Sequence, residues 1–399
     1  MTSPHLSTVF QPVVDLATGS PVAYEALTRG TREGTDVSPD RLFEDARSED
    51  RVAELDSRCW RTSLRSAAGT GLARPYSLLV NVEPESLRAG PFAHPLPSTP
   101  LVIELTERAL LSTPGALLQT LAHARSQGHA IAIDDLGADP ASLALIPIID
   151  PDVVKLDMRL IQARPDAEIA LVMSAVNRHA ATRDLVVIAE GIETADQLVT
   201  ARALGATHGQ GWFYGRPVTD VPDAHALAGL PIRRPSTADP AGGTPFEIVA
   251  ERLESKSSER DLLVQVSLFL EARASVSGDS AVVLTTFRHA TDITPGATER
   301  YLDLGEKCAL VMVHTRGATD VFEDTPIQVN HLDQDDPLLQ EWDIVVLTAD
   351  FAAVLAARAK DVAGHDEGTY DFILSHDREL AAAAARNLIL RGTEPAPSR

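Results

Sequence analysis

Cysteine is scarce in this chain, with only Cys59 and Cys308 among 399 residues. We assign the two cysteines to different domains, which excludes a disulfide framework as the basis of the fold. Neither cysteine has the spacing of a metal-binding motif. A reducing compartment is therefore the expected environment.

Positive charge is also in short supply. The chain has 35 lysines and arginines against 57 aspartates and glutamates, a formal net charge of −22. Proteins that bind nucleic acid polymers or anionic membranes usually display a basic face, so neither partner is expected. A small anionic ligand remains compatible, because metal ions and one or two arginines can bind it.

Long apolar stretches are missing as well. No uninterrupted apolar run approaches the roughly 20 residues of a membrane span. The first residues, MTSPHLSTVFQPVV, lack the basic region and long apolar segment of a signal peptide. We therefore expect a cytoplasmic protein.

The chain does have enough apolar material, 44% of its residues, for the cores of two domains. Short apolar runs alternate with segments of helical spacing over about the first 230 residues. The runs predicted as buried strands are residues 78–82, 101–105, 130–133, 153–156 and 185–189. The predicted helices are residues 38–68, 114–127, 166–183 and 195–204. This alternation predicts an α/β fold, a TIM-like (β/α)8 barrel over residues 1–230.

A second domain is predicted after the barrel. Residues 231–244, PIRRPSTADPAGGT, have the composition of a linker. Residues 245–399 then contain a predicted helical segment at 246–274 and strand-like runs at 281–287, 308–314 and 343–348. The domain ends with an alanine-rich helix whose predicted N-cap is Asp377. We interpret it as a smaller mixed α/β domain.

Acidic residues gather at the ends of the predicted barrel strands. The set comprises Glu25, Glu104, Asp134, Asp135 and Glu190, and the last four close or directly follow apolar runs. If the strands are parallel, these carboxylates meet at one mouth, where like charges are unfavourable unless cations neutralise them. Taken singly, each is more simply a solvated strand end or helix N-cap. Their joint occurrence predicts a site for divalent cations that prefer oxygen ligands.

Seven motifs carry a family resemblance. In order they are FQPVVDLATGSPVAYEALTR, LLVNVEPESL, VIELTE, AIDDLG, VVKLDM, VIAEGIET and GATHGQGWFYGRP. Together they resemble the EAL domain family of cyclic-di-GMP phosphodiesterases. The resemblance covers essentially residues 1–230, and the order of the motifs makes it specific.

The resemblance implies two Mg²⁺ or Mn²⁺ ions. The implied ligands of one ion are Glu25, Asn81, Glu104 and Asp134, and those of the other are Asp134, Asp135 and Glu190. It further implies catalytic roles for Glu190, for Lys155, which would hold the attacking water or neutralise developing charge, and for Asp157, which would orient that lysine or the water.

Substrate-side positions follow from the same resemblance. Arg29 corresponds to an arginine that grips a phosphate, and further substrate-binding or supporting positions are Gln11, Leu27, Glu193 and Gln210. Glu107 is either a first-turn helix residue or a support for the loop after the next strand. His208 is expected to be a packing or surface residue.

One loop departs from the family pattern. Active members commonly read DDFG followed by T-G-Y-S-S, whereas residues 134–142 here read DDLGADPAS, with Pro140 fixing one φ angle. In the family this loop positions the second metal ion and passes signals through a dimer interface. A non-catalytic cyclic-di-GMP receptor is therefore the alternative to an enzyme. A scaffold without nucleotide binding is disfavoured by the metal set and Arg29.

The segments QEWDIVVLTADFAAVLAARA and YDFILSHDRELAAAAARNLILR resemble the DICT family of sensory domains. The ligand or partner of this domain is unknown. Our hypothesis is that the barrel hydrolyses cyclic di-GMP to linear pGpG under control of the C-terminal domain. A homodimer is implied by the resemblance alone.

Overall fold

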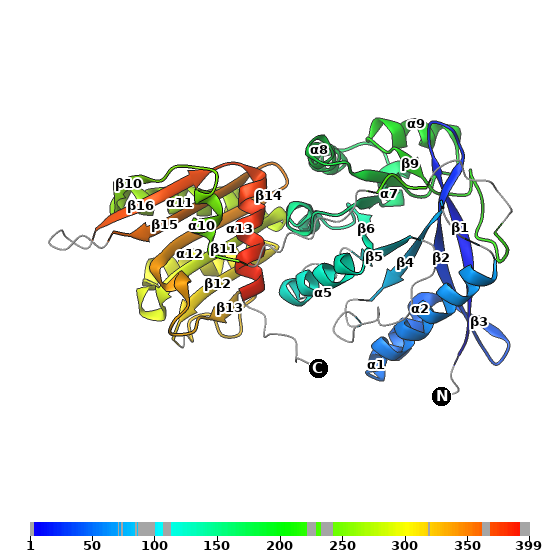
Figure 1. The fold of residues 1–399 in the computed structure, drawn as a ribbon, viewed down its shortest axis with the longest axis horizontal. Coiled ribbons are helices and arrows are strands. Elements are labelled where there is room, and N and C mark those ends of the chain that lie inside the picture. Colours follow the sequence, from blue (N-terminus) through cyan, green and yellow to red (C-terminus); the bar gives the residue numbers. More distant parts are fainter. Residues whose placement is uncertain are drawn as a thin grey trace. The chain divides into compact units, whose positions relative to one another are not determined.

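The computed structural model describes residues 4–70, 72, 75–83, 86, 100–106, 113–221, 229–232, 242–317, 320–360 and 368–391 (Figure 1). The chain divides into two compact units. The barrel unit comprises Met1–Asp139 and Pro151–Thr237, and the C-terminal unit comprises Pro140–Asp150 and Ala238–Arg399. Residues 140–150 thus lie within the barrel sequence but belong to the C-terminal unit. This exchange was not predicted from the sequence.

Eight strands close the barrel. Their order around the ring is β1 (His5–Asp15), β9 (His208–Gly209), β8 (Val186–Ala189), β7 (Val153–Leu156), β6 (Ala130–Leu136), β5 (Leu101–Thr106), β4 (Ser77–Val82) and β2 (Pro21–Arg32), which pairs again with β1. The predicted TIM-like barrel is therefore confirmed. β1 runs antiparallel to both of its neighbours, and the remaining ring pairs are parallel. A short strand, β3 (Thr35–Val37), extends the sheet from β2.

The described helices of the barrel unit follow the predicted segments, apart from the helix at residues 158–162, which was not predicted. They are α1 (Pro39–Ser48), α2 (Val52–Gly69), α5 (Pro114–Ser126), α7 (Met158–Gln162), α8 (Ala167–Thr182) and α9 (Ala195–Ala203). The segment predicted as one helix at 38–68 forms two. Ser38 caps the first, and Asp50, with a φ of +54°, lies in the break between them.

The barrel interior is layered, and this layering positions the site. One layer is apolar and consists of Val13, Ala23, Leu79, Val102, Ala132, Val153 and Ile188. Because side chains alternate along a strand, the residue two positions later points to the same interior. On the parallel strands that next layer is polar, namely Glu25, Asn81, Glu104, Asp134, Lys155 and Glu190. The polar layer therefore lies directly on the C-terminal side of the apolar core.

The C-terminal unit contains a mixed sheet. Its strands in spatial order are β10 (Lys256–Glu259), β16 (Thr369–Ser375), β15 (Ala352–Ala359), β14 (Glu341–Thr348), β11 (Ala281–His289), β12 (Leu310–Arg316) and β13 (Gln328–His331). The pairs β11–β12 and β12–β13 are parallel, and the others are antiparallel. The prediction of a second, mixed α/β domain is confirmed.

Helices cover both faces of this sheet. α11 (Arg260–Ser277) and α12 (Pro295–Lys307) pack on the face that includes Val313, whereas α13 (Arg378–Arg391) lies on the other, where His314 Nε2 meets Leu388 O at 2.8 Å. Buried alanines let α13 approach the sheet closely. Asp377 Oδ1 accepts from the amides of Glu379 and Leu380, which confirms the predicted N-cap.

The prediction of continuous helix over 246–274 was wrong. α10 (Pro245–Ala250) ends early, and strand β10 separates it from α11. Ser257 and Ser258 are weak helix formers, and they gain ladder partners in β16, where Ser257 Oγ also lies 2.7 Å from Asp371 Oδ1.

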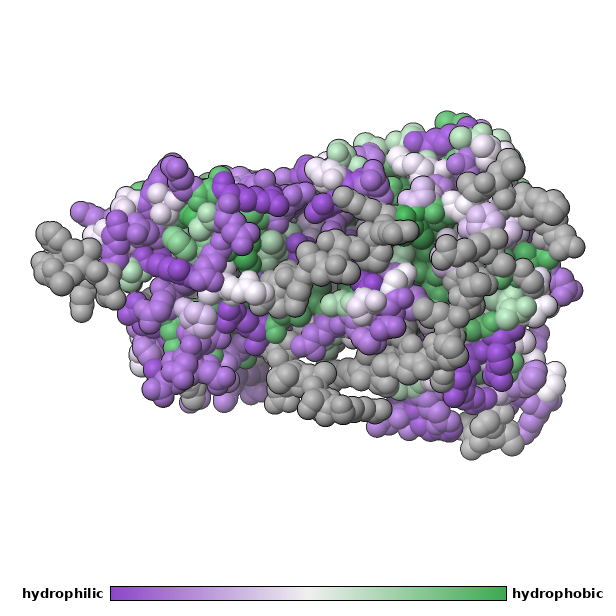
Figure 2. All heavy atoms as spheres, in the orientation of Figure 1, coloured by the Kyte–Doolittle hydropathy of each residue, from purple (hydrophilic) through white to green (hydrophobic). Residues whose placement is uncertain are grey.

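None of the described helices is long and apolar enough to cross a membrane. Figure 2 shows mainly hydrophilic residues on the described surface at the lower left, where Figure 1 places α12 and β13. This surface agrees with a chain in which 23% of the residues are charged.

Candidate metal centre

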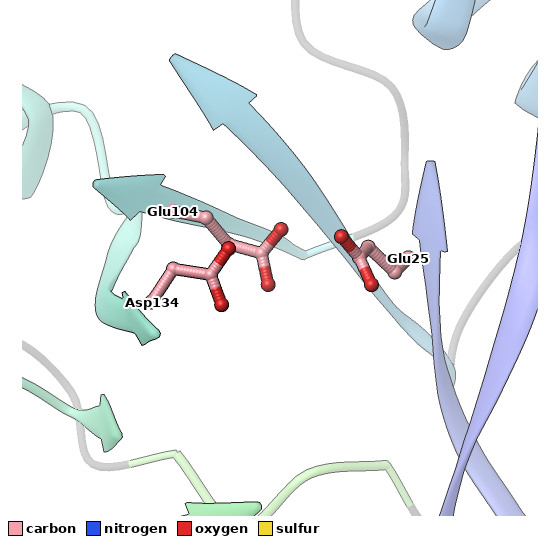
Figure 3. A group of neighbouring side chains, drawn as sticks. All are labelled: Glu25, Glu104 and Asp134. Carbon is pink, nitrogen blue, oxygen red and sulfur yellow. The ribbon is translucent and has the colours of Figure 1, made fainter. Parts of the chain in front are cut away.

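The polar layer brings the predicted carboxylates together in two groups. Ligand oxygens of Glu25, Glu104 and Asp134 all lie within 4.8 Å of one another, and so do those of Asp134, Asp135 and Glu190. Figure 3 shows Glu104 and Asp134 side by side, with Glu25 pointing toward them from β2. Asp134 belongs to both groups, so one carboxylate can serve two neighbouring cations.

Lys155 lies among these carboxylates. Its side chain is 1% exposed, and it is the single lysine in residues 1–255. The distances from Nζ are 2.8 Å to Asp134 Oδ1, 2.8 Å to Glu190 Oε1, 2.9 Å to Glu104 Oε1 and 3.5 Å to Glu25 Oε2. One ammonium group thus faces four carboxylates. Further positive charge at the site would be electrostatically favourable.

Protonation shifts report this excess of negative charge. Burial, assisted by neighbouring carboxylates, raises the pKa of Glu104 well above its usual range. The same causes raise the pKa of Asp135 to about 6 and that of Glu190 to about 8. Without added cations Glu190 holds a proton at pH 7, and Asp135 holds one below about pH 6. Divalent cations would neutralise these carboxylates in place of protons, so the donor set fits such cations.

Glu25 and Lys155 shift the opposite way, toward their charged forms. Burial opposes ionisation of Glu25, but Lys155 and hydrogen bonds from Gln210 and Asn81 outweigh it and lower its pKa. Burial likewise opposes the ammonium form of Lys155, but the surrounding carboxylates raise its pKa well above the usual value. Lys155 therefore stays positively charged at physiological pH.

Two amides complete the polar layer. Asn81 Nδ2 donates to Glu25 Oε1 and to Glu104 Oε2, both at 3.1 Å. Gln210 Nε2 donates to Glu25 Oε2 at 2.6 Å and to Gln11 Oε1 at 3.1 Å. A 180° rotation of the Asn81 amide would turn its carbonyl oxygen toward the same carboxylates, as a shared cation requires.

A bulge explains how two consecutive aspartates serve one site. The pairing of β6 with β7 shifts register between Ile133 and Leu136, and Asp135 has a φ of +55°. In a regular strand Asp134 and Asp135 would point to opposite faces. The bulge brings oxygens of both into one group. Gly137 has a φ of +97°, which residues with a side chain rarely adopt, and a Cβ there would also lie 2.7 Å from Leu160 Cδ1.

Other predicted residues have more ordinary surroundings. Asp157 caps α7, and its carboxylate Oδ1 accepts from Arg159, at 2.7 Å from N and 3.0 Å from Nε. Its role toward Lys155 stays a prediction. Leu27 and Arg29 are half-buried and share the face of β2 that carries Glu25.

The remaining predictions fall at the edge of the site or outside it. Glu193 is exposed in the loop after β8. Glu107 lies outside the described residues. His208 is buried, with Nδ1 2.9 Å from Thr207 Oγ1, and is a packing residue as expected.

Two protein families match this chain. Residues 1–217 match the EAL domain family. The chain belongs to the EAL family. Residues 249–360 match the DICT family, described as a sensory domain in diguanylate cyclases and two-component systems. Both predicted family resemblances are thereby confirmed.

Named relatives of this EAL protein include two from well-known bacteria. It is 29% identical over 218 residues to the probable cyclic di-GMP phosphodiesterase PdeB of Escherichia coli, covering 52% of this chain and 42% of PdeB. It is 27% identical over 232 residues to the cyclic di-GMP phosphodiesterase RocR of Pseudomonas aeruginosa, covering 55% of this chain and 58% of RocR. In both cases the match spans less than two thirds of the relative.

A solved structure is similar as well. BlrP1 of Klebsiella pneumoniae, in a manganese and cyclic-di-GMP complex, is 24% identical with a TM-score of 0.48, covering 55% of this chain and 59% of BlrP1.

The pKa shifts predict how cation binding by this EAL barrel depends on pH. Because Asp135 and Glu190 must lose protons, with pKa values of about 6 and about 8, to become ligands, Mn²⁺ affinity should rise between pH 6 and pH 8. The rise should be up to about tenfold per pH unit for each proton displaced. Calorimetric titration across this range measures it, and an affinity independent of pH would contradict the prediction.

The same shifts predict the stability of the metal-free protein. Carboxyl groups with raised pKa values hold protons in the folded state that the unfolded chain releases near pH 4. The free energy of unfolding should therefore fall as the pH rises from about 4 through about 8. Added Mn²⁺ should flatten this decline, as thermal unfolding in EDTA and in Mn²⁺ would show.

Proposed function

We propose that the barrel hydrolyses one phosphodiester bond of cyclic di-GMP to give linear pGpG, with two Mg²⁺ or Mn²⁺ ions as cofactors. The observation that carries the proposal is the position of Asp134 in both ligand groups of one mouth. Two adjacent oxygen sites that share a carboxylate match what an in-line phosphodiester displacement needs. The names of the relatives RocR and PdeB supply the substrate class.

The residues that would hold the ions fall into the two groups already described. Glu25, Asn81, Glu104 and Asp134 would hold one ion, and Asp134, Asp135 and Glu190 the other. When bound, such ions supply Lewis-acid charge and lower the pKa of a water to about 7, which makes it a nucleophile.

The chain's own groups complete the proposed reaction. Lys155 keeps a positive charge at the base of the mouth, where it can stabilise negative charge that develops on the phosphoryl oxygens. Arg29 offers a planar fork of donors to a phosphate of the nucleotide. Gln11, Leu27, Glu193 and Gln210 would line the substrate, and Asp157 would help to orient Lys155 or the attacking water.

Product analysis tests this function. Purified protein with cyclic di-GMP and Mg²⁺ or Mn²⁺ should yield one linear dinucleotide, heavier than the substrate by one water. Glu25→Ala should lower the rate by at least about 10²-fold, since it removes a ligand and a partner of Lys155. Mass spectrometry of the nucleotide follows both. Failure of the parent to form linear product with either metal would refute the enzymatic function.

The alternative is a receptor that binds cyclic di-GMP without turnover. It is favoured by residues 138–142, which read ADPAS in place of the family's T-G-Y-S-S. Calorimetry would then show tight, cation-dependent binding while the nucleotide stays intact over hours. The assay above separates the two functions directly.

A further inference from the structure

The segment between β6 and β7 belongs to the C-terminal unit. It comprises η1 (Pro140–Ala144) and α6 (Ile146–Ile149), and every residue from 141 to 149 is buried. Because all of these residues except Ser142 are apolar, the segment must be covered by protein on every side. Within the C-terminal unit η1 contacts η2 (Gly278–Ser280) and the strands β11 and β14, and α6 contacts α13.

Arg386 of α13 holds this segment by its backbone. Its Nη1 donates to Pro147 O at 2.8 Å and to Ile148 O at 3.2 Å. These carbonyls belong to the last turn of α6 and have no acceptor role inside that helix. A charged donor satisfies them more strongly than a neutral one would. Arg386 therefore fixes residues 147–148 relative to the core of the C-terminal unit.

Residues of the proposed metal site lie on both sides of the segment in the sequence. Four residues separate Asp135 from Pro140, and four separate Asp150 from Lys155. Asp134 and Asp135 sit in the bulge, where the regular ladder to β7 is interrupted. Asp134 pairs with Thr106 on the β5 side alone, whereas Glu104 pairs with neighbours on both sides. The placement of Asp134 and Asp135 thus depends more on the chain that follows them than the placement of Glu104 does.

We propose that Arg386 is a positioning residue for the metal centre. By holding residues 147–148, it sets the path of residues 136–150 and so the placement of Asp134 and Asp135. The ordering of α13 in the C-terminal unit then controls cation affinity in the barrel. The proposal rests on the proposed function only where hydrolysis is concerned, because cation binding can be measured by itself.

The test compares three variants of the full chain. Arg386→Ala removes the group that donates both hydrogen bonds to α6, whereas Arg386→Lys keeps a positively charged donor. Arg391→Ala is the matched control, because Arg391 is also on α13 and also bonds a backbone carbonyl, that of Gly243, together with Asp336 Oδ1 at 2.6 Å. Electron paramagnetic resonance of free Mn²⁺ gives the affinity, and hydrogen exchange follows amides 130–150.

Arg386→Ala should weaken Mn²⁺ binding about 10- to 100-fold, the range for loss of a supporting group behind metal ligands. Amides in 130–150 should exchange faster, Arg386→Lys should lie between, and Arg391→Ala should bind Mn²⁺ like the parent. Equal Mn²⁺ affinity of Arg386→Ala and Arg391→Ala would overturn the proposal.

A second measurement covers the case in which Arg386→Ala does not fold. Coupling between two sites is reciprocal, so Mn²⁺ binding to the parent should slow amide exchange in α13. Unchanged exchange there would overturn the proposal. If the parent does not hydrolyse cyclic di-GMP but still shows these changes in Mn²⁺ affinity and amide exchange, the phosphodiesterase function is refuted. The positioning role of Arg386 then still holds.

Discussion

Asp134→Asn is expected to lower cyclic-di-GMP hydrolysis by at least about 10³-fold, more than loss of a single electrostatic contact usually costs. Among the described residues, Asp134 is the one whose oxygens belong to both ligand groups. Asparagine keeps the shape but removes the negative charge, so both cations are bound more weakly. Steady-state rates at saturating Mn²⁺ and the number of Mn²⁺ ions bound per chain would record the two consequences.

Asp184→Asn is the matched control for this prediction. Asp184 is exposed and lies at the opposite, N-terminal end of β8, away from the mouth. The same chemical change there should leave rate and Mn²⁺ stoichiometry unaltered. If Asp134→Asn retained a rate within about tenfold of the parent, a shared-carboxylate mechanism would be untenable.

Lys155→Met should remove most activity and also destabilise the metal-free barrel. Its ammonium group lies within 2.9 Å of three carboxylates and is almost fully buried. Removing one partner of a buried charge network typically costs about 3–5 kcal/mol. We expect a loss of this order in the free energy of unfolding at pH 8 in EDTA. At lower pH the loss should shrink, because Glu104 and Glu190 take up protons.

Cations should compensate for the missing lysine. Mn²⁺ supplies positive charge to the same carboxylates, so it should stabilise Lys155→Met more than it stabilises the parent. Lys307→Met is the control, because Lys307 forms an exposed pair with Asp303 that contributes at most about 1 kcal/mol. Equal unfolding free energies of Lys155→Met and parent in EDTA would show that Lys155 does not hold the carboxylates together.

Much of this site could be predicted from sequence because its geometry follows from strand periodicity. Apolar runs ending in Glu104, Asp134 or Glu190 place each carboxylate one layer above the core, and parallel strands bring those ends to one mouth. The contact of Lys155 with several carboxylates is a tertiary property. Its isolation as the single lysine in residues 1–255 was nevertheless a signal in the sequence.

Other features depend on partners that no local pattern specifies. Residues 141–149 are apolar except for Ser142, so their sequence predicts burial but cannot say against which unit. The bulge at Asp134 and Asp135 arises from a register shift that periodicity does not encode. Arg386 stands in an alanine-rich helix, and only the fold shows which carbonyls it meets. Strand β10 was missed because its ladder partner lies more than a hundred residues later.

Anomalous diffraction from crystals grown with Mn²⁺ tests the central claim most directly. The account predicts two peaks in the barrel mouth, roughly 3.5–4 Å apart, with an Asp134 oxygen bound to both. Glu25, Asn81 and Glu104 should contact one peak, and Asp135 and Glu190 the other. A mouth without Mn²⁺ at saturating concentration, with the carboxylates still gathered around Lys155 alone, would contradict it.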